Sequence, residues 1–220
     1  MNTANNGFMG LGIAPKFIEV LTKNNYITPT PIQKQSIPIA ISGKDIIGIA
    51  QTGTGKTLAF GIPMLQILAQ TSGKGLVIAP TRELALQTDE ALQKIGRAFG
   101  LKTAVLIGGQ SMEIQLQRLR ANPHVIIATP GRLIDHLERK TARVNTVSIL
   151  VLDEADRMLD MGFAPQIKRI LEHLPKQRQT MLFSATMPKE IVALASHYMK
   201  LPVRVEVAPS GSAAKDISQE

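Results

Sequence analysis

The stretch Ala50-Gln51-Thr52-Gly53-Thr54-Gly55-Lys56-Thr57 decides the fold, because it leads out of one apolar run and into a second one. A glycine-rich turn at the start of a helix presents backbone N–H groups to phosphate oxygens with no Cβ in the way. At this spacing Lys56 reaches the β and γ phosphates, and the Thr57 hydroxyl is a ligand for Mg²⁺. The stretch therefore predicts a phosphate-binding loop for a nucleoside triphosphate. The alternative is a strand-to-helix turn that merely contains glycines, since Ala50 stands where glycine is usual.

A second group of charged residues, far downstream, supports this interpretation. The apolar run Ile149 to Leu152 ends in Asp153-Glu154-Ala155-Asp156. A carboxylate at the end of a strand beside the loop can hold Mg²⁺, and a neighbouring carboxylate can orient and deprotonate the attacking water. We therefore assign Asp153 to the metal and Glu154 to the water. The alternative is an acidic N-cap on the following helix.

Composition limits the classes of protein that the chain can belong to. Its 220 residues, 44% of them hydrophobic, fit one large domain with a sizeable core. The net charge of +8 favours a polyanionic partner such as nucleic acid. The absence of cysteine excludes disulfides, cysteine zinc sites and thiol nucleophiles. The chain has no basic-then-apolar leader and no long uncharged apolar stretch, so we expect it to be neither exported by a signal peptide nor membrane-spanning.

Short apolar runs alternate with segments of helical periodicity through most of the chain. Alternation of this kind indicates an α/β fold with a mostly parallel sheet covered by helices on both faces. The expected strands, about seven in number, are Ile46 to Ile49, Leu76 to Ala79, Ala104 to Ile107, Val125 to Ala128, Ile149 to Leu152, Met181 to Phe183 and Val203 to Val207. The expected helices include Leu84 to Phe99, Met112 to Leu119, Leu133 to Leu137, Ala164 to His173 and Glu190 to Met199.

Both ends of the chain have little to bury. Residues 1–7 are rich in asparagine, and residues 208–220 contain Ala-Pro-Ser-Gly-Ser-Ala-Ala. We expect one domain over residues 1–207 and a flexible linker over 208–220.

Seven short motifs together resemble those of the DEAD-box ATP-dependent RNA helicases, in the order of that family. The resemblance runs from about Phe8 to Val207, and it implies a RecA-like P-loop domain with a nucleotide-recognising segment over about residues 6–34. The motifs are Pro29-Thr30-Pro31-Ile32-Gln33, Gln51 to Thr57, Pro80-Thr81-Arg82-Glu83-Leu84, Gly108-Gly109, Thr129-Pro130-Gly131-Arg132, Asp153 to Asp156, and Ser184-Ala185-Thr186.

The resemblance implies that ATP is the nucleotide. Gln33 matches the glutamine that bonds the adenine edge, Phe8 stands at the spacing of the aromatic that stacks on the base, and Thr28 and Asp156 fall in the same nucleotide site. A buried amide facing guanine would meet mismatched donors and acceptors, which costs about 1–3 kcal/mol per unpaired group. The alternatives are a polar residue near a helix start for Gln33 and a hydrophobic anchor for Phe8. Asn25 replaces the usual glycine of this segment, and asparagine tolerates a left-handed backbone.

The resemblance also gives Ser184 and Thr186 a role beyond that of hydroxyls that close a turn. In the family these residues link the hydrolysis site to RNA-dependent rearrangement, and we expect hydrogen bonds from them to Asp156. They complete the expected catalytic set of Lys56, Asp153, Glu154, Ser184 and Thr186.

Three junctions between expected strands and helices are assigned to RNA: Pro80 to Glu83, Gly108-Gly109, and Thr129 to Arg132. Each is also a good cap or turn, but helix starts bind phosphate, and such loops gather at the carboxyl ends of the strands. With no Trp and two Tyr, the chain has few rings for stacking on bases, so we expect binding through phosphate and sugar, without sequence preference. Arg82 and Arg132 are the phosphate candidates. Four other basic residues, Arg118, Arg120, Lys168 and Arg169, are interpreted as solvated helix faces.

The family requires a second RecA-like domain whose arginines stabilise the transferring phosphoryl group, and this sequence contains no segment of that type. We therefore expect the chain to act as the ATP-binding half of an RNA helicase that couples hydrolysis to RNA binding and local unwinding. By itself it should bind nucleotide and hydrolyse it weakly. We expect a monomeric, cytoplasmic protein. A DNA-directed translocase and a stand-alone ATP-binding or RNA-binding module are the alternative functions.

Overall fold

A computed structural model describes residues 6–208, so the expected linker over 208–220 lies, except for its first residue, outside the described residues, as do residues 1–5. Its centre is one seven-stranded sheet in the order β3-β4-β2-β5-β6-β1-β7. All six neighbouring pairs are parallel. The strands are β1 (Ile46–Ile49), β2 (Lys74–Ile78), β3 (Thr103–Leu106), β4 (Val125–Ala128), β5 (Val147–Leu152), β6 (Gln179–Ser184) and β7 (Val203–Glu206). The α/β fold and the seven-stranded parallel sheet expected from the sequence are confirmed.

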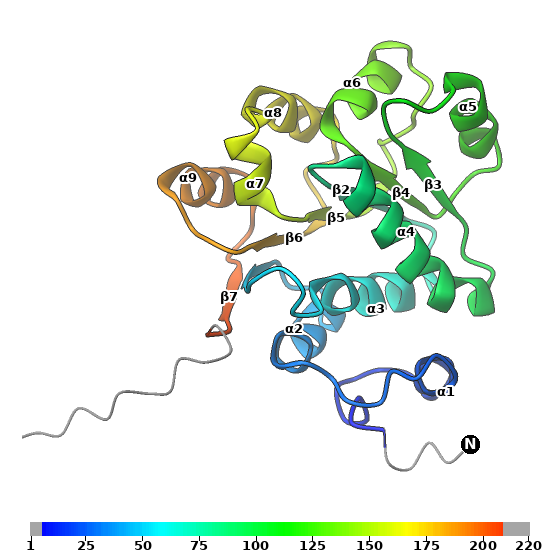
Figure 1. Ribbon diagram of the computed structural model, residues 1–220, viewed down its shortest axis with the longest axis vertical. Coiled ribbons are helices and arrows are strands. Elements are labelled where there is room, and N and C mark those ends of the chain that lie inside the picture. The colour runs from blue at the N-terminus through cyan, green and yellow to red at the C-terminus, as the bar shows by residue number, and fades with distance from the viewer. Residues whose placement is uncertain (1–5, 209–220) are drawn as a thin grey trace, which may run out of the picture.

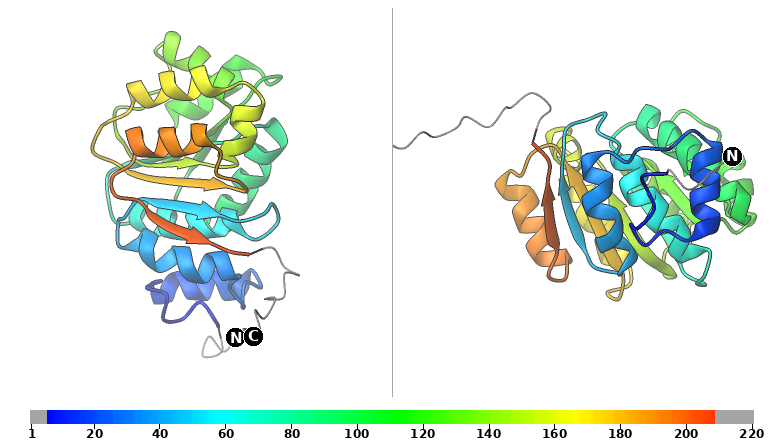
Figure 2. Two further views of the ribbon diagram at one scale, coloured as in Figure 1. Left: turned by 90° about the vertical axis from the view of Figure 1, so that its left-hand side faces the viewer. Right: turned by 90° about the horizontal axis from the view of Figure 1, so that it is seen from below.

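Helices cover both faces of the sheet (Figures 1 and 2). The first four helices pack through one hydrophobic cluster, and α5 to α9 lie against the other. The helices are α1 (Pro15–Lys23), α2 (Pro31–Ile41), α3 (Lys56–Leu68), α4 (Arg82–Gly96) with the short 3₁₀ turn η2 (Arg97–Phe99), α5 (Met112–Arg120), α6 (Pro130–Glu138), α7 (Ala155–Asp160), α8 (Ala164–His173) and α9 (Lys189–Tyr198).

The central strands are apolar because both of their faces are covered. All six residues of β6 are buried, and so are the last four of β5. A Cβ on Gly48 of β1 would lie 2.5 Å from the ring of Phe183 in β6, so only glycine lets that ring cross the neighbouring strand. The same ring packs against Phe60 of α3, with the ring centroids 5.6 Å apart. These contacts fix β1, and with it the loop that follows, against β6.

The segment before β1 is fastened to the rest of the domain by polar side chains. The Asn6 amide donates to the Thr22 hydroxyl and to the Tyr26 carbonyl, at 2.9 Å each. Gln66 of α3 donates to the Gly12 carbonyl and accepts from the Ala14 N–H. The Asn25 backbone is left-handed, with φ 61°, as its replacement of glycine leads one to expect. Residues 6–41 therefore pack as part of the same body as the sheet.

None of the helices within residues 6–208 has the length and apolar character that crossing a membrane requires.

A buried histidine ties α6 to α5. The His136 ring lies 2.9 Å from the Gln115 amide oxygen and 2.8 Å from the Thr141 hydroxyl, and the Gln115 amide donates to the Ile107 carbonyl. Burial lowers the pKa of His136, and the nearby charge of Arg132 lowers it further. The histidine is therefore held neutral between the two helices.

We expect this histidine to make the domain less stable in mild acid. Because its pKa in the folded state is lowered, the unfolded chain takes up the proton first as pH falls through about 6.5. The free energy of unfolding should fall between pH 7.5 and pH 5, and His136→Gln should make that fall less steep. Each unit of pKa difference is worth about 1.4 kcal/mol. Urea unfolding across this pH range measures both slopes, and parallel curves for the two proteins would contradict the assignment.

Candidate functional site

The glycine-rich loop follows β1 and leads directly into α3. Gly53 and Gly55 have left-handed backbones, with φ 81° and 89°. A Cβ on Gly55 would lie 2.5 Å from the Gln33 amide nitrogen. The left-handed backbone and this lack of space both exclude a side chain at the position. The Thr54 hydroxyl closes the turn by donating to the Gln51 carbonyl at 2.6 Å. The loop thus takes the shape of a strand-to-helix turn that leaves the N-terminus of α3 open.

Lys56, the first residue of α3, has a buried ammonium group. The residue is 6% exposed, and no hydrogen-bond partner for its Nζ lies among the described residues. A buried cation without a partner is costly, unless a ligand supplies the negative charge. The loop backbone and the Lys56 ammonium therefore fit a phosphate chain, which brings several anionic oxygens.

Asp153 follows β5 and faces this ammonium group. The residue is 2% exposed, and its backbone N–H continues the ladder by donating to the Ile78 carbonyl. Burial raises the pKa of the Asp153 carboxyl to about 6, and the charge of Glu154 also raises it. The Lys56 ammonium lowers this pKa, but by less than burial raises it. The Lys56 and Asp153 side chains, distant in sequence, are thus brought close enough to interact electrostatically. This is the juxtaposition that the sequence interpretation requires.

Glu154 joins the end of β5 to the loop. Its carboxylate accepts from the Thr52 hydroxyl and from the Arg157 guanidinium, each at 3.2 Å. Its backbone is left-handed, with φ 49°, a conformation that costs a side-chain-bearing residue about 1 kcal/mol or more. The residue precedes α7 without capping it by its side chain. The acidic-cap alternative therefore does not describe Glu154, which is directed to the loop instead.

A metal ion at this position would depend on the nucleotide for part of its coordination. Among residues 6–208 there is no group of three or more acidic or histidine side chains placed to hold an ion by themselves. Mg²⁺ commonly takes one or two protein ligands and completes its shell with phosphates and waters. Asp153 and the Thr57 hydroxyl fit such a limited set.

Ser184 and Thr186, after β6, contact Asp156 as expected. The Thr186 hydroxyl and backbone N–H donate to the Asp156 carboxylate at 2.9 and 3.0 Å, and the Ser184 hydroxyl accepts from the Asp156 N–H at 3.2 Å. Burial pushes the pKa of Asp156 up, but the hydrogen bonds outweigh it and lower the pKa. The Ser184 carbonyl also accepts from Ala50 N–H. One segment thus contacts both the glycine-rich loop and the acidic motif.

The residues assigned to adenine already have contacts within the protein. The Gln33 amide accepts from the Thr30 N–H at 2.9 Å and donates to the Gly55 carbonyl at 3.0 Å, so it closes a capping box and holds the loop. Phe8 is 1% exposed within the hydrophobic cluster of α1 to α4, so its ring has no face open to a base. The helix-start and hydrophobic-anchor alternatives describe these two residues here, while Thr28 is exposed.

The three loops assigned to RNA meet around one open pocket of about 570 Å³. Pro130 is the one assigned residue outside its lining, because it is buried as the first residue of α6. Sequence reasoning missed three lining residues, Asp135, Met161 and Phe163. The assigned residues in the lining are Pro80, Thr81, Arg82, Glu83, Gly108, Gly109, Thr129, Gly131 and Arg132.

Two arginines fasten the middle loop of this pocket. Arg82 donates to the Gly108 carbonyl at 3.2 Å, and Arg132 donates to the Gln110 carbonyl at 3.1 Å. Arg132 also pairs with Asp135, at 3.5 Å, which is the i+3 residue on α6. Each guanidinium carries five N–H donors, so these bonds leave donors for a ligand. The Thr81 hydroxyl caps α4 by accepting from the Leu84 N–H.

A parallel sheet with this loop after β1 and these carboxylates after β5 defines a P-loop domain of the RecA-like class. The family profile described as DEAD/DEAH box helicase matches residues 30–194. The chain belongs to the DEAD/DEAH box helicase family.

Named relatives and solved structures agree with this assignment. The ATP-dependent rRNA helicase RRP3 of Yarrowia lipolytica is 48% identical over 215 residues, which cover 96% of this chain and 45% of that protein. The DEAD-box ATP-dependent RNA helicase CshA of Geobacillus kaustophilus is 45% identical, over 96% of this chain and 46% of its own. A crystal structure of a DEAD box protein from Methanococcus jannaschii superposes with TM-score 0.87 at 34% identity, covering 91% of this chain and 55% of that one. The chain spans about half the length of the curated relatives it matches.

Proposed function

We propose that the chain binds ATP with Mg²⁺ and forms the nucleotide-binding half of an ATP-dependent RNA helicase. The observation that carries the proposal is the buried Lys56 ammonium, which has no hydrogen-bond partner in the described structure and is near enough to Asp153 to lower the pKa of that carboxyl. The ammonium and the backbone N–H groups of the loop bind the phosphates, and Thr57 and Asp153 hold the metal. When bound, Mg²⁺ neutralises charge on the β and γ phosphates.

The acidic residues divide the remaining work. Glu154 accepts hydrogen bonds at the mouth of the loop, where it can orient a water and take its proton. Asp156 is held ionised by Thr186 and Ser184, so it serves to connect the site with the segment after β6. Gln33 has one amide hydrogen and one lone pair beyond its two bonds here, which leaves it able to bond the adenine edge without leaving the loop.

RNA is the proposed partner of the pocket formed by the loops after β2, β3 and β4. Its arginines and open helix starts suit phosphate, and Phe163 is the one aromatic residue in its lining. Binding should therefore be salt-sensitive and independent of sequence. A second RecA-like domain would supply the arginines that stabilise charge during phosphoryl transfer, and unwinding is proposed for the two domains together. A cytoplasmic location and a monomeric chain stay predictions.

Removing the buried ammonium should abolish most nucleotide affinity. A charge-assisted hydrogen bond contributes about 1.5–3 kcal/mol, so Lys56→Ala should weaken binding at least about tenfold. Titration with a fluorescent ATP analogue in the presence of Mg²⁺ measures the effect. Lys168→Ala, an exposed lysine on α8, is the matched control and should bind as wild type. Equal affinity in Lys56→Ala and wild type would disprove the loop assignment.

RNA affinity should depend on the arginines of the pocket. Arg82→Ala with Arg132→Ala should lower affinity for oligo-uridine, and each lost phosphate contact should reduce the slope of log K against log salt by about 0.7. The exposed Lys16→Ala on α1 is the control. Fluorescence anisotropy over a salt series gives both quantities. An unchanged slope would remove the two arginines from the interface, and equal binding of the matching DNA would favour a DNA-directed translocase.

Turnover should require the proposed second domain. Residues 1–220 should hydrolyse ATP slowly with or without RNA, and joining them to the second RecA-like domain of a relative should raise the RNA-stimulated rate by a factor on the order of a thousand. In the joined protein, Glu154→Gln should keep ATP affinity and lose turnover. Phosphate release measures both. Robust RNA-stimulated turnover by residues 1–220 alone would refute the first expectation, and normal turnover of the variant would refute the second.

A further inference from the structure

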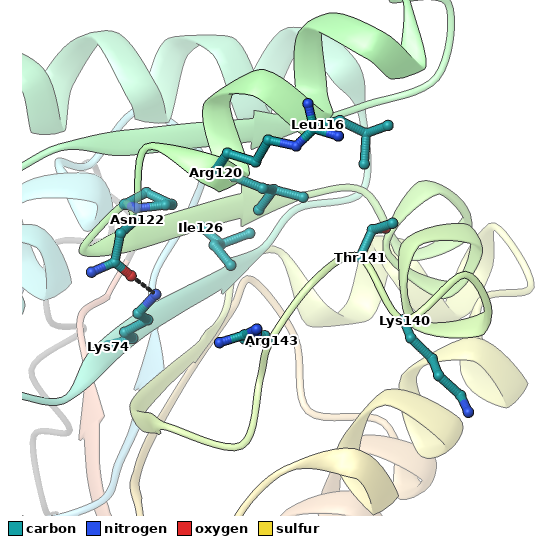
Figure 3. A pocket seen from close by; sticks show the side chains of 10 residues that line it. Lys74, Leu116, Arg120, Asn122, Ile126, Lys140, Thr141 and Arg143 are labelled. Atoms are coloured by element: carbon teal, nitrogen blue, oxygen red, sulfur yellow. Dashed lines mark hydrogen bonds between the residues drawn. The ribbon is translucent and has the colours of Figure 1, made fainter.

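A basic cavity lies at the amino ends of the strands, whereas the glycine-rich loop lies at their carboxyl ends. It has a volume of about 580 Å³ and is formed where α5 and α6 end and where β2 and β4 begin (Figure 3). None of its lining residues belongs to the sites described above. The lining comprises Lys74, Leu116, Leu119, Arg120, Asn122, Pro123, Ile126, Lys140, Thr141 and Arg143.

The cavity has a charge of one sign. Four of its lining residues are cationic, and neither aspartate nor glutamate occurs in its lining. Within residues 6–208 none of the four cations takes part in a salt bridge. The Lys74 ammonium is fixed by a 2.6 Å hydrogen bond to the Asn122 side chain, and burial followed by the charge of Arg143 lowers the pKa of Lys74. Lys74 and Arg143 therefore act on each other as like charges, with no acidic residue in the lining to offset them.

Helix ends account for only two of these four charges. Cations near the C-termini of α5 and α6 are favoured by about half a negative charge at each helix end. Arg120 and Lys140 would satisfy that preference, but Lys74 and Arg143 lie on a strand and in a loop. Lys140 also has a left-handed backbone, with φ 55°, at the position after a helix where glycine is usual. In Figure 3 its side chain is directed away from the other three cations.

The floor of the cavity is apolar. Leu116 and Leu119 are half-buried, and Ile126 beneath them is 1% exposed. This combination suits a peptide that inserts an aliphatic side chain among carboxylates. It suits an RNA strand less well, because a phosphate backbone has no apolar group to insert and the lining offers no aromatic ring for a base. An RNA strand bound in the pocket of the three loops, at the carboxyl ends of the β-strands, would also have to pass around α5 or α6 to reach this cavity.

We propose that this cavity is a docking site for an acidic peptide segment of a protein partner, with a leucine-like side chain against Leu116 and Leu119 and carboxylates on Lys74, Arg120 and Arg143. The Lys74 ammonium, fixed by Asn122, orients one carboxylate, and the exposed Arg120 and Arg143 hold others. The site is remote from the ATP and RNA sites, so its occupancy does not compete directly with either.

The test uses a fluorescein-labelled peptide of glutamates around two leucines, titrated into the full chain. Arg120→Glu combined with Arg143→Glu should weaken its binding by about tenfold or more, because both reversals place like charges against the peptide. Arg118→Glu is the matched control, since it makes the same change on α5 outside the lining, and it should bind as wild type. Affinity for the ATP analogue should be the same in all these proteins, which reports on folding.

Two further probes decide whether the cavity is specific. A peptide with serines in place of the leucines should bind several-fold more weakly, and oligo-uridine should not displace the labelled peptide. Equal binding of the serine peptide would overturn the proposal, since only charge would then matter. Displacement of the labelled peptide by oligo-uridine, together with loss of oligo-uridine binding in the double variant, would show an RNA site. That result would overturn the proposal as well. Absence of peptide binding up to about 1 mM would also overturn it.

Discussion

The arrangement of the site depends on an ammonium group and two carboxylates that are buried together at one edge of a parallel sheet. Lys56, Asp153 and Glu154 are each less than a tenth exposed. Burying charges without full pairing is unfavourable, so the surrounding packing must compensate for it. Gly48 beneath Phe183, the fully buried β6 and the buried last four residues of β5 supply packing of this kind. The domain thus keeps a charged, preorganised site at the expense of some stability, as functional sites commonly do.

Much of the fold follows from the sequence, because buried parallel strands are continuous apolar runs. β1 and β4 begin and end at the predicted residues, and so does α8. The beginning of α6 was placed too late, at Leu133, because apolar periodicity starts there, whereas Pro130 begins the helix by its fixed φ. The assembly of three distant loops around one pocket was also predictable, since carboxyl ends of parallel strands share an edge.

Details that depend on distances between elements were not predictable. Phe8 has the spacing of a base-stacking residue, yet its ring is buried because α1 to α4 close over it. Gln33 donates to a carbonyl of the glycine-rich loop. Arg82 and Arg132 donate to carbonyls of the separate loop after β3, which contains Gly108 and Gly109. Arg120 is exposed, as expected for a solvated helix face, but nothing in one helix shows that neighbouring elements bring Lys74 and Arg143 to the same cavity.

The position of β7 has a consequence for anything attached after it. β7 pairs in parallel with β1, and the Val207 N–H donates to the Ile49 carbonyl. The polypeptide therefore leaves the sheet at the carboxyl ends of the strands, where the glycine-rich loop also emerges. A module tethered there is confined to a small volume around the phosphate end of the site. Its local concentration would be governed by tether length more than by its own affinity, and lengthening the tether would dilute it without altering any contact surface.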